Sequence, residues 1–278
     1  MKHFRPRLSR RAFWVLCALL VCLRLALTGL SAGVHLGGRA PLDDELMFRA
    51  ANHITAGQWL GAYDYLTLSK AMFFPVWLAL LHALHLPYLI SGAALWCGAA
   101  LLAAFAFSTL WAQKKDPAMG RVLTLGLFAA LAFLPSSWAA YTLRVYRDNI
   151  FPALCLYFFA GMAGMALRAV LTPEKPLWPW LAAAGAGLAC GYLDREDAGL
   201  FLLPFAAAAT VIVAVALAGK RRWKALAAQV IPYVMLGVGV LTFCTLNYTH
   251  YGVFALSDFS EGSFAAAMGA MMRVDTDS

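Results

Sequence analysis

The chain has 278 residues, of which 62% are hydrophobic and only 13% are charged. A soluble domain carries about 25% charged residues, so this composition excludes a water-soluble globular protein and favours the lipid bilayer as solvent. The net charge of +8 follows the membrane pattern described below, and we therefore expect no nucleic-acid partner. The six cysteines lie in apolar runs without a CxxC pair, so we expect them to bind no metal.

Seven apolar runs predict seven membrane-spanning helices in an all-α bundle. Each run is close to the roughly 20 residues that cross about 30 Å of hydrocarbon. The runs are 13–34, 88–112, 122–140, 150–171, 177–193, 200–219 and 226–247. The first run follows a basic segment, as a signal peptide does, but it is longer than a signal-peptide core. We therefore interpret it as a first membrane helix.

Residues 36–86 form the predicted first outer loop. From Glu45 to Ile54 the pattern of apolar and polar residues is amphipathic and predicts a helix lying along the membrane surface. The apolar positions of this pattern are Leu46, Phe48, Ala50 and Ile54, and the polar positions are Arg49, Asn52 and His53. The further apolar run 71–86 contains Pro75 and ends before Pro87. We predict that this run is an interfacial or re-entrant helix that does not cross the membrane.

The distribution of lysine and arginine predicts the topology, because cytoplasmic loops carry an excess of these residues. With a cytoplasmic N-terminus, fourteen of the 22 basic residues fall on the cytoplasmic side, within 2–11, 114–121, 168–175 and 220–224. Twelve of the 14 acidic residues then fall on the outer side. The prediction is a multi-pass protein of the cell membrane whose working face lies outside.

Residues 1–247 form the predicted membrane module, and 248–278 form an outer-face segment. That segment is polar, and we expect no closing helix or domain in it. We interpret it as the start of a further C-terminal region that the chain does not complete.

Three consecutive acids, Asp43, Asp44 and Glu45, follow the first helix. Adjacent carboxylates repel one another, so at least one of them needs a cationic partner or a raised pKa. Asp is also favoured at helix starts. One acid is enough to cap a helix, however, so capping does not account for all three. We therefore take these residues as candidate catalytic carboxylates.

Basic residues at the outer membrane boundary oppose the general bias of lysine and arginine towards the cytoplasm. The second outer loop holds Arg144, Arg147 and Asp148, and Lys70 lies in the first loop. The third outer turn reads Asp194, Arg195, Glu196 and Asp197. An anionic phosphate and the first-loop acids are both suitable partners for these arginines. Snorkelling to lipid headgroups and ion pairing within the turn are the structural alternatives.

This order of elements resembles the GT-C superfamily of membrane glycosyltransferases. The resemblance rests on an acid pair followed three residues later by an aromatic, in Asp44 to Phe48, and then on GQWLGAYDYLTLSK and a proline-containing helix. The YRD at Tyr146 to Asp148 falls where the family often has a second acid. The resemblance covers nearly the whole chain, because the membrane module of that fold has seven helices.

The resemblance implies an enzyme that transfers a sugar from a polyprenyl-phosphate donor to an acceptor on the outer face. Asp44 would be the catalytic carboxylate, supported by Asp43 and Glu45. The donor phosphate would be held by residues at the outer boundary, namely Arg147, Arg144, Asp148, Arg195 and Lys70. The partners are then the lipid-linked sugar, the bilayer and an acceptor glycan, lipid or protein.

The chain departs from the family pattern in one respect that concerns metal. It has no DxD in the second outer loop, only Arg147-Asp148-Asn149, so dependence on a divalent cation stays open. Two other functions also stay open, a transporter or lipid-binding protein and a non-catalytic membrane scaffold. Transporters often show internal repeats and broken helices at the midplane, and the sequence has neither.

Overall fold

The computed structural model is helical and describes residues 8–33, 42–112, 116–172, 174–258 and 263–273. Within these residues there is no β-strand. The longer helices are α1 (Arg10–Gly29), α4 (Tyr88–Trp111), α5 (Pro117–Ala132), α6 (Phe151–Leu171), α7 (Trp178–Asp194), α8 (Gly199–Gly219) and α10 (Ile231–Tyr251). The shorter ones are α2 (Leu42–Thr55), α3 (Phe73–Ala83), α9 (Trp223–Ala227), α11 (Ser263–Met271) and the 3-10 turns η1 (Pro135–Trp138), η2 (Ala140–Leu143), η3 (Arg147–Asn149) and η4 (Ala228–Val230).

Each of the seven predicted apolar runs contains a helix. Among the described residues, five segments are long and apolar enough to cross a membrane: α1, α4, α6, α8 and the stretch Trp223–Tyr251 that ends with α10. The helices α5 and α7 have 16 and 17 residues, which corresponds to about 24–26 Å. The apolar helices fit a membrane protein, and the seven crossings predicted from the sequence are taken up below.

Helix α5 ends earlier than the run 122–140 predicts. The α-helix stops at Ala132, and the chain continues through η1 and η2. Pro135 at the start of η1 has no backbone N–H group, so it cannot continue the hydrogen bonding of α5. The hydroxyl groups of Ser137 and Thr142 donate to nearby backbone carbonyl groups. These turns place the loop before α6 against the C-terminal half of α1, where Arg24 donates to the carbonyl of Ser137.

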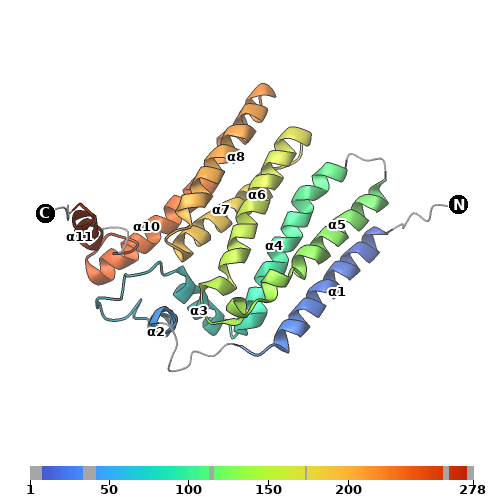
Figure 1. Cartoon of the computed structure of the whole chain (residues 1–278). Helices are drawn as coiled ribbons and strands as arrows, with labels where there is room; N and C mark the ends of the chain where they lie inside the picture. Colours follow the sequence, from blue (N-terminus) through green and yellow to red (C-terminus); the bar gives the residue numbers. More distant parts are fainter. Residues whose placement is uncertain (1–7, 34–41, 113–115, 173, 259–262, 274–278) are drawn as a thin grey trace.

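Long helices stand side by side in Figure 1, and α2 and α3 lie together at the end where α1 finishes and α4 begins. The hydrophobic core has three clusters of buried residues. One joins α6, α7 and α8, a second joins α1, α4 and α5, and the third lies between α2, α3 and the start of α6. Helices α6 and α7 approach closely: a Cβ on Gly187 would lie 2.4 Å from the backbone nitrogen of Phe158.

Helix α2 confirms the amphipathic segment of the first loop but corrects its buried face. Leu46, Met47 and Ala50 are buried, whereas Phe48, predicted on the apolar face, is 48% exposed. Residues three, four and seven apart share one side of a helix, so the buried face follows Asp44, Met47 and Ala51 rather than alternate residues.

The segment after α10 packs against the first loop. The predicted boundary after residue 247 falls inside α10, which continues to Tyr251 and ends at Gly252 in the left-handed conformation. The segment beyond was expected to hold no helix, but its apolar residues form α11. Trp59 donates to the side chain of the buried Asn247 over 2.9 Å, and the backbone nitrogen of Asp258 donates to Leu68 over 2.8 Å. These contacts hold the loop in place over the helix ends.

Candidate functional site

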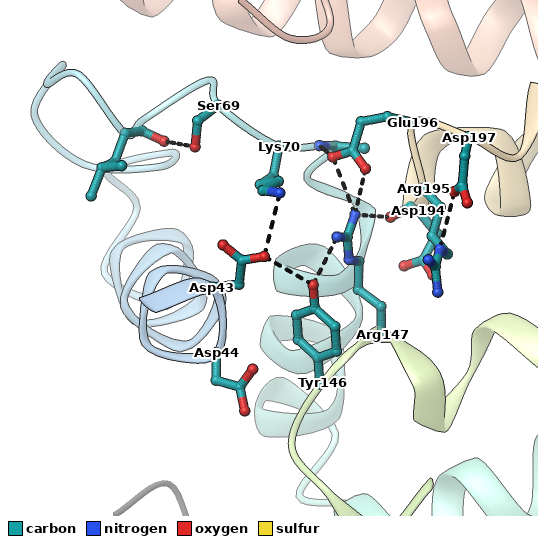
Figure 2. A network of polar contacts seen from close by, with 12 residues as sticks. Asp43, Asp44, Ser69, Lys70, Tyr146, Arg147, Asp194, Arg195, Glu196 and Asp197 are labelled. Carbon is teal, nitrogen blue, oxygen red and sulfur yellow. Dashed lines mark hydrogen bonds and ion pairs between the residues drawn. The ribbon is translucent and has the colours of Figure 1, made fainter. Parts of the chain in front are cut away.

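Three segments that are far apart in the sequence meet at one end of the bundle. They are the first loop, which contributes the first turn of α2 and Lys70, then the loop that leads into α6, and the turn between α7 and α8. Figure 2 shows the network of hydrogen bonds and ion pairs that joins them. Because helices α1, α4, α6 and α8 all have an end here, the network is built on their rigid termini.

The first part of the network is the pair formed by Asp44 and Arg144. Both the Nε and one Nη group of Arg144 donate to the carboxylate of Asp44. Asp44 is 1% exposed, while the side chain of Arg144 is 28% exposed. The hydrogen bond and charge of Asp44 raise the pKa of Arg144. The backbone of Arg144 is held in turn by Tyr88, whose hydroxyl donates to its carbonyl over 2.7 Å.

The second part surrounds Asp43, whose side chain is 38% exposed. Lys70 lies 3.3 Å from its carboxylate, and the hydroxyl of Tyr146 donates to it over 3.2 Å. Burial raises the pKa of Tyr146, and the hydrogen bond from Arg147 offsets this only in part. The pKa therefore lies above its ordinary value, and the phenol keeps its proton at neutral pH. Asp43 is therefore a carboxylate that keeps contact with solvent.

The third part is centred on Arg147, which is buried. Its Nη2 donates to the Tyr146 hydroxyl over 2.8 Å, and its Nη1 donates to Glu196 over 2.9 Å and to the carbonyl of Asp194 over 3.0 Å. Burial lowers the pKa of Arg147, but Glu196 and Tyr146 outweigh this and raise it above its ordinary value. Glu196 also accepts from the backbone nitrogen of Ala71 over 2.6 Å.

The α7–α8 turn contributes a further pair and a buried acid. Arg195 donates to Asp148 over 3.2 Å and to Asp197 over 3.1 Å. Asp194, the last residue of α7, lies beyond the apolar run 177–193 and is completely buried. Neither of its carboxylate oxygens has a hydrogen-bond partner in the part of the chain that the structure describes. Burial raises the pKa of Asp194 well above its ordinary value, against the opposing effect of Arg147.

A small cavity lies between α1, α4 and the loop before α6. Its volume is about 60 Å³. Arg24, Thr28, Ser137, Asp148 and Asn149 supply polar groups to its wall. The sequence analysis did not include Arg24 in the candidate site, although an arginine inside an apolar helix is an unusual feature in itself.

The structure brings seven of the eight predicted site residues into the network: Asp43, Asp44, Lys70, Arg144, Arg147, Asp148 and Arg195. The exception is Glu45, which is exposed and forms no ion pair with the residues that the structure describes. Tyr146 and Glu196 are members that sequence reasoning left without a role. Tyr146 precedes Arg147 in the YRD motif, which was its only signal.

No grouping of three or more His, Cys, Asp or Glu with the arrangement of a metal site occurs in the described part of the chain. Within the network every carboxylate except that of Asp194 is paired with an arginine or lysine side chain. The dependence on a divalent cation, which the sequence left open, stays open.

Comparison of the chain with protein-family models, with curated proteins and with solved structures finds no match.

Proposed function

We propose that the chain is the membrane module of a glycosyltransferase that takes its sugar from a polyprenyl-phosphate donor. The observation that carries the proposal is the convergence of acids and bases from three distant segments at one end of an apolar helical bundle. That arrangement suits a reaction between a membrane-bound donor and a water-exposed acceptor. The order of elements along the chain, described above, supports the same reaction class.

In this reaction an acceptor hydroxyl oxygen forms a bond to the anomeric carbon of the sugar. The bond between that carbon and the phosphate oxygen breaks, and the polyprenyl phosphate leaves with the electron pair. A carboxylate takes the hydroxyl proton. The leaving phosphate carries negative charge, which nearby cations stabilise.

We assign the proton-accepting role to Asp43 in place of Asp44. A general base needs to come within hydrogen-bond reach of its substrate. Asp44 is 1% exposed and accepts two bonds from Arg144, whereas Asp43 is 38% exposed. Lys70 and Tyr146 hold the Asp43 carboxylate in place from two sides. In this proposal Asp44 positions the start of α2, and Glu45 remains a solvent-exposed neighbour.

The test is transfer of a radiolabelled sugar from a polyprenyl-phosphate donor in proteoliposomes, with a cell-envelope fraction as the source of acceptors. We expect Asp43→Asn to lower turnover by about 10²–10⁴-fold, the usual contribution of a general base. Glu45→Gln is the matched control and should retain wild-type turnover. Transfer by the wild type with an unchanged rate in Asp43→Asn would remove Asp43 from the mechanism.

A membrane scaffold is the second candidate, and one observation favours it. Each of the four cations assigned to the donor phosphate is paired with a carboxylate, which is what a purely structural network requires. The assay separates the two functions, because a scaffold transfers no sugar from any lipid-linked donor while it folds normally.

We also propose that seven helices cross the membrane, including α5 and α7, with the network on the outer side. The 11-residue α3 measures about 16 Å, which is too short for the roughly 30 Å hydrocarbon layer. A membrane-impermeant maleimide added to intact cells should label Tyr65→Cys in the first loop. It should not label Lys224→Cys until the membrane is opened. The reverse result would invert the topology.

A further inference from the structure

Arg24 lies in the C-terminal half of the apolar helix α1 and is only 3% exposed. One Nη group donates to the carbonyl oxygen of Ser137 over 2.8 Å and to its hydroxyl at 3.4 Å. The guanidinium carbon lies 3.5 Å from the centre of the Trp138 ring. The Nε group has no hydrogen-bond partner. Across the described residues, Arg24 forms no ion pair.

A buried guanidinium without a counter-charge is costly. Arginine side chains within membrane helices usually pair, face water or mark a pathway for a charged substrate. Neutral partners such as Ser137 satisfy hydrogen bonds but leave the charge uncompensated. An anion bound beside Arg24 would supply the missing counter-charge and so explain why an arginine is buried here.

The cavity beside Arg24 offers space for such an anion. One water needs about 10–15 Å³ of this kind of volume, so the roughly 60 Å³ present suits a group of four or five heavy atoms. Thr28 and Thr142 lie in its wall. Asp148 also lines the cavity, but Arg195 pairs with this carboxylate at 3.2 Å and compensates its charge.

The cavity also adjoins the candidate site directly. Asp148 and Asn149 belong to both the cavity wall and the loop that carries Arg147. The buried Oδ1 of Asn149 has no hydrogen-bond partner among the described residues, so it can accept a hydrogen bond from a ligand hydroxyl. A ligand that spans Arg24 and this loop would place an anionic group and a hydroxyl-bearing group side by side.

The position along α1 defines the kind of anion. Arg24 lies five residues before the end of α1 at Gly29, about 7.5 Å along the axis. On the same helix, Leu19, Leu23 and Leu27 are exposed on an apolar face. An anion with a long apolar tail can therefore keep its tail along α1 in the bilayer and its head in the cavity.

We propose that the Arg24 cavity binds the phosphate group of a polyprenyl-phosphate lipid. This inference rests on the proposed function and names the donor-phosphate site within it. Arg144, Arg147, Arg195 and Lys70 are all engaged with carboxylates, so each would have to give up a pair to hold a phosphate. Arg24 has no such pair to break.

The test measures binding of polyprenyl monophosphate to the detergent-solubilised chain by native mass spectrometry, without any transfer reaction. We expect Arg24→Gln to weaken binding by about 10–100-fold, because a charge-assisted hydrogen bond contributes roughly that factor. Gln keeps a donor for the Ser137 carbonyl and so protects the fold. Arg24→Lys should restore binding only in part, since lysine lacks the planar fork.

The control variant is Arg121→Gln. Arg121 lies at the opposite end of the bundle and donates to the carbonyl of Leu8 over 2.7 Å, so its loss should leave binding unchanged. A second variant, Ala93→Leu, fills the cavity while Arg24 stays in place and should weaken binding to a similar degree. Thermal unfolding of each variant shows whether it is folded.

The ligand series separates the sources of the anion. Polyprenol, which lacks the phosphate, should bind weakly to every variant, and phosphatidic acid and inorganic phosphate should not compete. If inorganic phosphate competed at a concentration similar to that of the lipid, the site would bind a free anion and the proposal would be overturned. Unchanged binding in both Arg24→Gln and Ala93→Leu would also overturn it.

Failure of this inference and failure of the proposed function are distinguishable. If wild type transfers sugar and both cavity variants bind and transfer normally, the phosphate site is elsewhere and the enzyme proposal stands. If the wild type binds polyprenyl phosphate through Arg24 but transfers no sugar, the site stands and the enzyme proposal falls.

Discussion

The pair between Asp44 and Arg144 allows a quantitative prediction about stability. We consider three variants, Asp44→Asn, Arg144→Gln and the double variant. Removing one partner of a buried ion pair leaves the other charge without compensation and costs about 3–5 kcal/mol. Because Arg144 is 28% exposed, it regains part of its hydration when Asp44 is neutral, and we reduce the cost of Asp44→Asn to about 2–3 kcal/mol.

The two single variants should therefore differ. Arg144→Gln leaves the carboxylate of Asp44, which is 1% exposed, and we expect the full cost of about 3–5 kcal/mol. In the double variant two neutral amides can hydrogen-bond to each other. The double variant should lose less unfolding free energy than the two single variants together, by about 1.5–3 kcal/mol, as expected for residues in contact.

The assay is equilibrium unfolding in mixed micelles of a mild detergent and sodium dodecyl sulfate, followed by tryptophan fluorescence. Glu45→Gln is the control on the same helix turn and should unfold like the wild type, because Glu45 is exposed. Two results would refute the reasoning: a coupling energy below about 0.5 kcal/mol, or a larger loss for Asp44→Asn than for Arg144→Gln.

Three further predictions concern packing, pH and the first loop. Gly187→Ala should destabilise the α6–α7 contact by about 1–3 kcal/mol, while the control Gly237→Ala, where a Cβ meets no atom within 4 Å, should not. The raised pKa of Asp194 means that the folded state binds more protons than the unfolded state, so stability falls as pH rises above about 4. Asp194→Asn should therefore match the wild type near pH 3 and exceed it in stability at pH 7, and an equal difference at both pH values would contradict this. Asn247→Ala removes the acceptor of the 2.9 Å bond from Trp59 and should speed proteolysis of the first loop, whereas unchanged cleavage would show that the bond does not hold it.

The predicted outer-side cations find their partners within the chain itself. Basic residues on the outer side indicated a missing partner, and both an anionic phosphate and the first-loop acids were suitable. The structure places Asp44 against Arg144 and Asp43 against Lys70, which satisfies these cations within the chain. Among the described residues, a buried arginine without an ion pair is found instead at Arg24, which was not among the predicted site residues.

The local features of the chain were determined by its sequence. Apolar runs near the length of a membrane crossing predicted where the helices lie, because in hydrocarbon each backbone polar group must bond within its own segment. Turn-forming and capping residues are local as well, as at Asp116, whose side chain caps α5. The one-sided distribution of acids likewise indicated that a polar site lies at one end of the bundle.

Only the tertiary structure decided which of three adjacent acids faces inwards. Consecutive residues of a helix point about 100° apart, so α2 turns Asp44 towards the core, leaves Asp43 at the edge and exposes Glu45. The choice depends on how α2 packs against the loop before α6, about 100 residues away in the chain. Contacts over such distances are set by the packing of helix ends, and no local pattern of residues encodes them.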